Sequence, residues 1–371
     1  MYQIPTLPLA QDVETKAVLK QLAQAHRRLA ELKGAVKSMP NENILINTLS
    51  LQEAKDSSAV ESIITTHDEL YKAELFASQY TTPASKEVQS YADALRQGFT
   101  LVKEKNLLTC NTIIEIYRLI KRNTGGFRAT PGTTLQRENT HEIIYTPPQS
   151  YDEIVLYMRN LELFINDASL SEVDPLVKMA IIHHQFESIH PFSDGNGRTG
   201  RIINILYLVL QGLLDLPVLY LSRYVIQNKS EYYRLLQQVR DRGEWEEWIL
   251  FLLKGIEITS QETVRLVEGI KCLMQEYKQS IRNKLPKIYS QDLLNNLFRH
   301  PYTKIEFVCN ELNVTRPTAT SYLNQLEQQG YVQKLKLGRE NFYLNNKLFD
   351  LLLNAFHLDV TEQVTEINSI G

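Results

Sequence analysis

The chain has 371 residues, of which 43% are hydrophobic and 22% are charged, so it is long enough for two or three packed units. Its 40 basic and 43 acidic residues leave a formal net charge of −3, which gives no overall preference for nucleic acid or an acidic membrane surface. Three scattered cysteines without metal-ligand spacing, and the lack of a signal-like or membrane-spanning apolar segment, favour a cytoplasmic protein.

Apolar residues recur at intervals of three and four along most of the chain. This spacing predicts helices over residues 15–32, 86–104, 110–121, 151–165, 175–188, 199–213 and 248–282. Residues 125–150 differ, because glycine and proline there surround a short β-branched and aromatic run that indicates a small hairpin or extended edge segment. We therefore expect a mainly α fold with a small β-hairpin.

The loop between the helices predicted at 175–188 and 199–213 combines residue types that suit phosphate chemistry. Its sequence, HPFSDGNGRTGR, runs from His190 to Arg201. Glycines at a helix start let phosphate oxygens reach free backbone N–H groups, and Arg198 and Arg201 lie on neighbouring faces of that helix. Asp194 is placed to hold Mg²⁺ against the same phosphates, and the imidazole of His190 suits proton removal from an attacking hydroxyl. For any one of these residues a structural role is the better interpretation, but not for all of them within one short loop.

Three residues near this loop are expected to be structural. Phe192 stands between two polar positions and most simply packs inward, which would pin the loop. His183 and His184 are adjacent on a helix and therefore point in different directions, which makes them a poor metal site and favours packing or hydrogen bonding.

The C-terminal part of the chain has a pattern of its own after a linker predicted at residues 284–286. Helices predicted at 291–298, 304–312 and 315–329 are followed by two strands, at 331–337 and 342–344, around a tight turn. This order is that of a winged helix-turn-helix domain over residues 287–371. The polar residues that such a domain would offer to DNA are Arg316, Thr318, Thr320, Ser321 and Asn324 on the third helix, and Lys334, Lys336 and Arg339 in the wing. Their small positive charge leaves both DNA binding and protein binding open.

The loop sequence HPFSDGNGRTGR resembles the signature of the Fic (Fic/Doc) family, H-P-F-x-D/E-G-N-G-R-x-x-R, at every defining position. The resemblance extends over roughly residues 1–253, and many bacterial relatives carry an appended winged helix. It implies an N-terminal helical region over residues 1–105 with an inhibitory motif, and a Fic catalytic core over residues 106–283. The activity that it implies is transfer of AMP from ATP to a Tyr, Thr or Ser hydroxyl of a protein, including the enzyme itself, with release of diphosphate.

The family's site residues carry over by position. The resemblance makes His190 the general base and Asp194 the Mg²⁺ ligand. It places ATP against Gly195, Asn196, Gly197, Arg198, Thr199, Gly200 and Arg201, with Tyr233 lining the adenine site. The segment Glu142, Ile143, Ile144 and Tyr145 resembles the family's flap, which holds the target backbone by strand addition.

An upstream segment, DSSAVES, resembles the family's inhibitory motif S/T-x-x-x-E-G/N. Ser57 and Glu61 are its defining residues here and share one helical face. In relatives the glutamate pairs with the second arginine of the signature, which here is Arg201, and excludes a productive γ-phosphate. Ser62 stands where the family has Gly or Asn, so we expect the helix to continue or to end less cleanly, with weaker inhibition.

Other activities stay open at this point. The chain could be chiefly a DNA-binding or protein-binding regulator with a sensing Fic core. The same site could remove AMP from a modified protein, with Glu61 positioning the attacking water, or could transfer phosphate if the nucleotide bound inverted. The glycines between Asp194 and Arg198 resemble those of AMP-transferring members, which favours AMP transfer. The oligomeric state also stays open, with a homodimer as one alternative.

Overall fold

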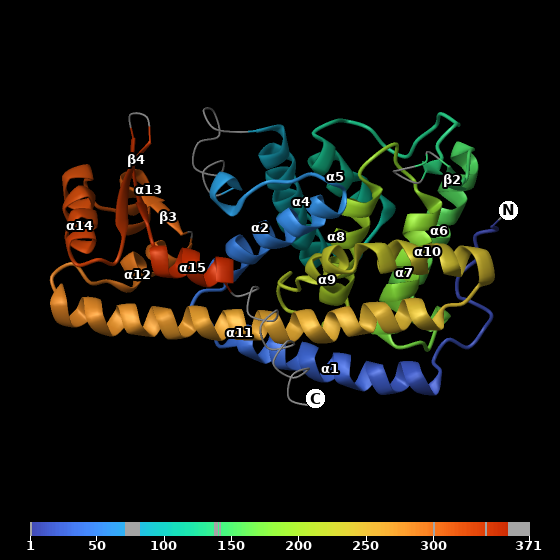
Figure 1. Cartoon of the computed structure of the whole chain (residues 1–371), viewed down its shortest axis with the longest axis horizontal. Helices are drawn as coiled ribbons and strands as arrows, with labels where there is room; N and C mark the ends of the chain where they lie inside the picture. The colour runs from blue at the N-terminus through green and yellow to red at the C-terminus, as the bar shows by residue number, and fades with distance from the viewer. Residues whose placement is uncertain are drawn as a thin grey trace.

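The computed structural model describes residues 2–70, 82–136, 140, 142–299, 301–337 and 340–354. The chain is mainly helical, as predicted (Figure 1). The helices and strands of its first two thirds are α1 (Lys16–Lys37), α2 (Glu42–Val60), α4 (Pro83–Lys105), α5 (Cys110–Lys121), β1 (Leu135–Gln136), β2 (Ile143–Tyr145), α6 (Tyr151–Asn166), the 3-10 helix η1 (Ala168–Leu170), α7 (Pro175–Ile189), α8 (Asn196–Leu210), α9 (Leu221–Gln227), α10 (Lys229–Arg242) and α11 (Glu246–Lys284).

Helix starts in this part of the chain follow from local sequence. The hydroxyls of Thr15, Thr82, Thr109 and Ser150 each accept a hydrogen bond from the backbone N–H three residues on, which satisfies one of the free donors of a helix start. The predicted helices in this part of the chain are all confirmed, with ends that differ by a few residues.

The centre of the molecule is the pair α7 and α8. Every residue of α7 from Leu176 to Ile189 is buried, and α8 is buried from Arg198 to Val209. The two helices pack on each other, while α4 and α5 cover α8, and α6 and α11 cover α7. The loop that joins α7 to α8 is therefore held by a fully packed support. Strands β1 and β2 form the predicted hairpin, an antiparallel pair in which Leu135 lies opposite Tyr145.

The C-terminal part contains α12 (Gln291–Arg299), β3 (Tyr302–Lys304), α13 (Ile305–Leu312), α14 (Arg316–Gln328), β4 (Gln333–Leu337), β5 (Glu340–Leu344) and α15 (Asn346–Asn354). Helices α12, α13 and α14 and the hairpin of β4 and β5 confirm the predicted order of elements. The sheet gains a third strand, β3, in the order β3-β5-β4. We did not predict β3 or α15, and Lys304 ends β3 instead of beginning α13.

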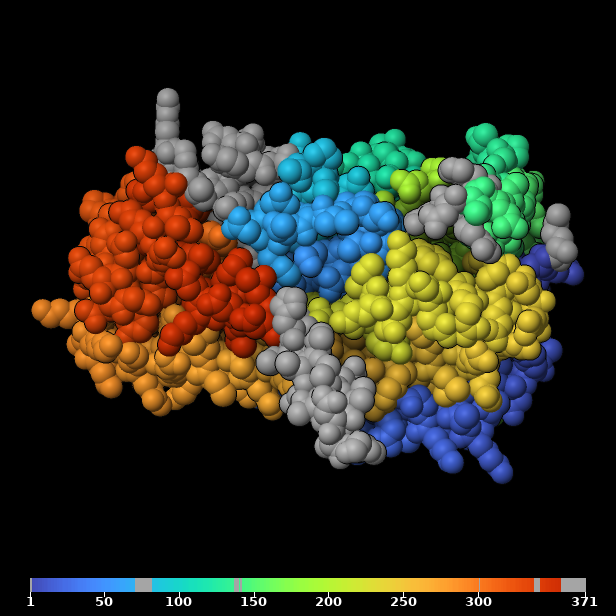
Figure 2. Space-filling model, in the orientation of Figure 1, coloured from blue at the N-terminus to red at the C-terminus, as the bar shows by residue number. Residues whose placement is uncertain are grey.

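The expected separation of the C-terminal part from the rest by a linker is not what the structure shows. Helix α11 is 39 residues long, packs along α1 and continues under the C-terminal helices (Figure 1). Its Tyr277 is buried and lies 3.0 Å from both the Tyr331 carbonyl and the Asn345 amide oxygen. Helix α12 packs on α2, and the surfaces of the two parts are continuous in Figure 2. The buried residues of the C-terminal part and of the rest of the chain form one hydrophobic cluster, because α11 contributes buried side chains to both parts. The exact domain boundaries stay predictions.

Among the described residues, no helix combines the length and apolarity that a membrane span requires.

Candidate active site

The chain reverses direction between α7 and α8 through two residues in the left-handed region. His190 ends α7 with φ 49° and ψ 58°, and its N–H bonds the Phe186 carbonyl. Gly195 precedes α8 with φ 74°, a conformation that glycine adopts without steric cost. Arg128 braces the reversal, because its Nε donates to the His190 carbonyl at 2.9 Å and its N–H to the Pro191 carbonyl at 2.8 Å. Its guanidinium also bonds the Pro148 carbonyl. His190 is thus held in a strained conformation by a neighbouring loop.

Two of the predicted ATP-binding residues use their side chains to build the loop, and their contact with ATP stays a prediction. The amide of Asn196 pairs with both the N–H and the carbonyl of Phe192, at 2.9 and 2.8 Å. The hydroxyl of Thr199 donates to the Gly195 carbonyl at 2.9 Å. As predicted, Phe192 packs inward, fully buried and stacked on Tyr117 at 3.9 Å. The side chains of Asn196 and Thr199 are therefore engaged within the protein.

Gly200 also has a packing role where we predicted contact with ATP. A Cβ there would lie 3.0 Å from the Glu187 carboxylate and 3.1 Å from Phe186, so glycine lets α8 approach α7. Gly197 differs from it, since a Cβ there would lie 2.7 Å from Glu61 Oε1 and 3.0 Å from Arg201 Nη1. Of these two glycines, Gly197 is the one that faces the charged groups at the start of α8.

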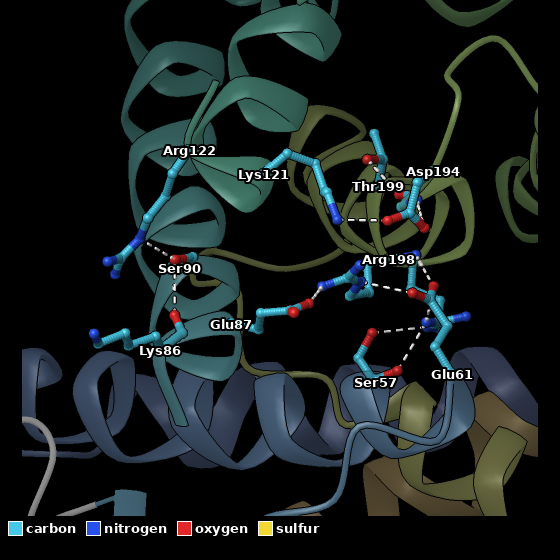
Figure 3. Close-up of polar contacts among 12 residues, drawn as sticks. Ser57, Glu61, Lys86, Glu87, Ser90, Lys121, Arg122, Asp194, Arg198 and Thr199 are labelled. Carbon is cyan, nitrogen blue, oxygen red and sulfur yellow. Dashed lines mark hydrogen bonds and ion pairs between the residues drawn. The ribbon is translucent and has the colours of Figure 1, made fainter. Parts of the chain in front are cut away.

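The carboxylate of Glu61 occupies the start of α8 (Figure 3). Its Oε1 accepts from the backbone N–H of Arg198 at 2.8 Å and from Arg201 Nη2 at 3.1 Å, and its Oε2 accepts from Arg198 Nε at 2.7 Å. Backbone N–H groups and the helix dipole favour an anion at this position. The expected pairing of Glu61 with Arg201 is present, and Glu61 also contacts Arg198, so its carboxylate lies where the helix start favours an anion.

Ser57 holds the second arginine from the same helix. Its hydroxyl accepts from Arg201 Nε at 2.7 Å, and its carbonyl accepts from Arg201 Nη2 at 2.8 Å. The guanidinium is buried. Burial alone would lower the pKa of Arg201, but the charge of Glu61, together with smaller contributions from the neighbouring tyrosines, raises that pKa overall. The predicted grouping of Ser57, Glu61 and Arg201 is thus what the structure contains.

Helix α2 ends cleanly at Val60, in contrast to our expectation for Ser62. The N–H of Ser62 bonds the Ala59 carbonyl and the N–H of Ile63 bonds the Ser58 carbonyl, which is the Schellman pattern of a helix end. Ser62 adopts the left-handed conformation with φ 63°. The serine therefore accepts the backbone strain that Gly or Asn would relieve, and the helix does not continue.

Asp194 lies at the mouth of the same cradle. Its Oδ1 accepts from the Gly195 N–H at 2.7 Å, and its Oδ2 accepts from Lys121 Nζ, a residue of α5. Partial burial opposes ionisation, but the hydrogen bond and charge of Lys121 outweigh it and lower the pKa of the Asp194 carboxyl. The carboxylates of Glu61 and Glu87 also lie beside the cradle, and both contact Arg198.

The donor set fits a magnesium ion that arrives with a nucleotide. Mg²⁺ commonly takes one or two carboxylates and completes its shell with phosphate oxygens and water. The described part of the chain has no group of three or more His, Cys, Asp or Glu side chains that would form a complete protein cage. Asp194 beside an anion-binding helix start matches that requirement.

The imidazole of His190 is neutral at physiological pH. Burial, followed by the charges of Arg240 and Arg128, lowers its pKa to about 4. Arg240 is itself buried, and it donates to the Ser188 hydroxyl at 3.1 Å and the Glu187 carbonyl at 3.3 Å. A neutral imidazole can accept a proton, which is the state that a general base needs.

The hairpin is anchored two residues before this histidine, where Tyr145 bonds Ser188, and a groove of about 440 Å³ runs along β2. Ile143 and Ile144 are exposed, at 57% and 38%, and Glu142 is exposed as well. Tyr145 is different, because it is buried, donates its hydroxyl to the Ser188 carbonyl at 2.9 Å and lies under the guanidinium of Arg240. We grouped Tyr145 with the flap residues, but its side chain anchors the hairpin and does not face outward.

The remaining candidates fall into two groups. Tyr233 is 46% exposed and its ring meets Tyr232 edge-on at 5.1 Å; its contact with adenine stays a prediction. His183 and His184 are buried and bond the Tyr232 hydroxyl and the Leu236 carbonyl, which confirms their structural role.

The polar face of α14 is partly used within the C-terminal part. The Thr320 hydroxyl donates to the Arg316 carbonyl, and Asn324 accepts from the Tyr343 hydroxyl at 3.2 Å. Lys334 and Lys336 are exposed on β4, while Arg339 lies outside the described residues. DNA binding stays a prediction.

The architecture defines a helical protein whose anion-binding helix start is filled by its own glutamate. Three family models match the chain: the Fic/DOC family N-terminal model over residues 19–100, the Fic/DOC family model over residues 107–208, and the C-terminal domain model of protein adenylyltransferase SoFic-like proteins over residues 273–348. The chain belongs to the Fic/DOC family.

Individual relatives agree with this assignment. The chain is 29% identical over 160 residues to the protein adenylyltransferase Fic of Aedes aegypti, and 27% identical over 169 residues to the protein adenylyltransferase fic-1 of Caenorhabditis elegans. These matches cover 43% and 44% of this chain but 30% of each relative, so the chain matches about a third of their length. The fold is similar to that of a Fic family protein from Desulfovibrio desulfuricans G20, with a TM-score of 0.56, 17% identity and coverage of 92% of this chain and 98% of the other.

Proposed function

We propose that the protein transfers AMP from ATP to a Tyr, Thr or Ser hydroxyl of a protein, including itself, and releases diphosphate. The observation that carries this proposal is the convergence of His190, Asp194 and two arginines on one helix start, where the carboxylate of Glu61 sits as a phosphate would. The names of the relatives support it, since both are protein adenylyltransferases.

The chain's own residues account for binding and proton transfer. The polyphosphate replaces Glu61 at the N–H groups of α8, and Arg198 and Arg201 neutralise its charge. The target hydroxyl gives its proton to the neutral imidazole of His190 as its oxygen bonds the α-phosphorus. The bridging bond between the α- and β-phosphates breaks, and the electron pair leaves with diphosphate. Such a reaction depends mainly on positioning and charge neutralisation, which the cradle supplies.

Asp194 would hold Mg²⁺, which supplies neutralisation of phosphate charge when it is bound. Lys121 neutralises the same carboxylate in the structure described here.

The hairpin offers a place for the target. The groove along β2 is lined by Ile143, Ile144, Gln237 and Arg240, and Arg240 is also one of the charges that act on His190. An extended target segment that pairs with β2 would run beside the general base. Because the side chain of Tyr145 is buried, the target meets the two isoleucines and Glu142 instead.

The assay is a parallel incubation with α-labelled and γ-labelled ATP on wild type, Glu61→Gly and His190→Ala. Protein-bound label from the α position alone supports AMP transfer, and we expect His190→Ala to lose it while it still binds nucleotide, because the base acts on the target hydroxyl. Label from the γ position alone would make the protein a kinase. Absence of label from both nucleotides in Glu61→Gly would favour a regulator or an enzyme that removes AMP.

A further inference from the structure

Arg198 is held from two sides by carboxylates of different helices. Its side chain is 2% exposed. Its Nε contacts Glu61 Oε2 of α2 at 2.7 Å, and its Nη1 contacts Glu87 Oε2 of α4 at 2.6 Å (Figure 3). Sequence patterns gave no reason to single out Glu87, which stands in an ordinary amphipathic helix.

The two carboxylates differ in what an incoming phosphate would displace. Glu61 also takes the backbone N–H of Arg198 and the guanidinium of Arg201, so it occupies the anion position itself. Glu87 contacts Nη1 of Arg198, which is not one of the nitrogens that hold Glu61 at the anion position. A polyphosphate that replaces Glu61 therefore leaves the ion pair of Arg198 and Glu87 in place.

Glu87 is presented by a helix that is fixed independently of Glu61. One turn further along α4, Ser90 accepts from Arg122 Nε of α5 at 2.6 Å, and the Tyr91 hydroxyl donates to Glu53 of α2 at 3.1 Å. At Gly98 a Cβ would lie 2.7 Å from Leu206 and 3.1 Å from Ile116, so α4 packs closely on α8 and α5. The helix that carries Glu87 is thus held in place by contacts that do not involve Glu61.

We propose that Glu87 is a positioning residue for nucleoside triphosphate binding, which orients Arg198 towards the polyphosphate after Glu61 has left. With Nη1 fixed by Glu87, Nε is freed, and Nη2 lies 3.7 Å from where a Cβ of Gly195 would be, at the mouth of the cradle. A planar guanidinium held at one corner presents its other two nitrogens in a fixed geometry, which suits a phosphate. The proposal rests on the proposed function.

If Glu87 were instead a second inhibitory residue, its substitution would have the opposite effect on nucleotide binding. If Glu87 mainly neutralised Arg198, its removal would raise nucleotide affinity and transfer. We favour positioning, because Glu87 leaves the N–H groups of α8 and Arg201 free for phosphate and because a buried arginine without a partner loses its orientation.

The test measures binding of α,β-methylene-ATP, which cannot be cleaved between the α- and β-phosphates, by calorimetry with Mg²⁺. All variants carry Glu61→Gly, and AMP is the second ligand. We expect Glu87→Gln to weaken binding of the triphosphate analogue about tenfold. This value is at the low end for a hydrogen bond to a charged group, because Glu87 is 40% exposed. Affinity for AMP should stay within about twofold, because AMP lacks the phosphates that Arg198 meets. In transfer assays the KM for ATP should rise by the same factor with little change in kcat.

Glu104→Gln is the matched control, since it makes the same exchange at an exposed position at the far end of α4. It should change the affinity for neither ligand. Glu87→Asp keeps the charge but shortens its reach, and we expect an intermediate loss, which keeps the test decisive if Glu87→Gln lowers the melting temperature. Unchanged or tighter binding of the triphosphate, or an equal loss for AMP, would overturn the proposal. A Glu61→Gly parent that binds the analogue but transfers no α-label would instead refute the proposed function.

Discussion

Glu61→Gly should convert a restrained enzyme into a fast one. The substitution removes a carboxylate that makes three charge-assisted hydrogen bonds, to the Arg198 N–H, to Arg198 Nε and to Arg201 Nη2, at 2.8, 2.7 and 3.1 Å. Each of these donors is one that a polyphosphate needs, so ATP must compete with the protein's own anion for them.

The size of the effect follows from these contacts. Hydrogen bonds to charged groups contribute about 1.5–3 kcal/mol each in buried settings, and they are not additive. Glu61 is 21% exposed, so we take about 2–3 kcal/mol for the whole carboxylate. This corresponds to a gain of roughly 30- to 150-fold in the population of the open site, since 1.4 kcal/mol is a factor of ten. Wild type should be slow but measurable.

The assay is incorporation of α-labelled ATP into the enzyme itself, for wild type, Glu61→Gly, Arg201→Ala and the double variant. Arg201→Ala should cancel the gain, because a released phosphate chain has lost its clamp, whereas independent effects would add. Glycine at the next position, Ser62→Gly, keeps the carboxylate and serves as the comparison, since it should not raise transfer. If Glu61→Gly is no faster than wild type, the contacts of Glu61 do not restrain the reaction and the proposed inhibition is wrong.

Three further predictions concern the helices around the site. Ser62→Gly removes a left-handed serine with φ 63° and should stabilise the end of α2 by about 0.5–1 kcal/mol, so basal α-label transfer should fall about two- to fivefold, and a rise would contradict the strain argument. Burial raises the pKa of Glu53 to about 8, so the folded state binds more protons than the unfolded state between about pH 4.5 and 8 and stability should decrease across this range; Glu53→Gln should flatten that slope in urea titrations, and an unaltered slope would show that Glu53 is ionised. The hydrogen bond to Asp174 raises the pKa of His26, so its contribution is complete below about pH 6.5 and is lost as the pH rises through the folded-state value; His26→Ala should therefore lower the melting temperature more at pH 6 than at pH 8.5, and equal losses would argue against it.

Local patterns were sufficient for the parts of the structure that local forces determine. Apolar spacing predicted the helices, and the residue types of the loop from His190 to Arg201 predicted an anion site at the start of α8. The grouping of Ser57 and Glu61 with Arg201 was predictable only from the resemblance, because the first two residues lie 144 and 140 positions from Arg201. Ser62 shows the limit, since the sequence suggested a continued or less clean helix end, but its backbone adopts the left-handed conformation and α2 ends at Val60.

The residues that sequence reasoning missed are single charged side chains in ordinary surroundings. Lys121, Arg128, Arg240 and Glu87 each act on the loop or its arginines from another element. A lone lysine or glutamate on an amphipathic helix is most often solvated, and nothing in its neighbours reveals a partner 73 or 111 positions away. Such pairings depend on how helices pack, and packing is not encoded within any one window of the sequence.

The position of Glu61 depends on more than the cradle it fills. Helix α2, at whose end it lies, is tied to α9 by the Glu53 carboxyl on Ser222 and to α4 by the Tyr91 hydroxyl. The C-terminal part contributes as well, because α12 packs on α2 and the Tyr302 hydroxyl donates to Asp68 at 2.7 Å, a few residues beyond Glu61. Removing the chain after Arg282 would therefore take away part of the support of α2 and uncover Tyr277. The C-terminal part therefore helps to hold Glu61 in place, and it is connected to the site through the packing of α12 on α2.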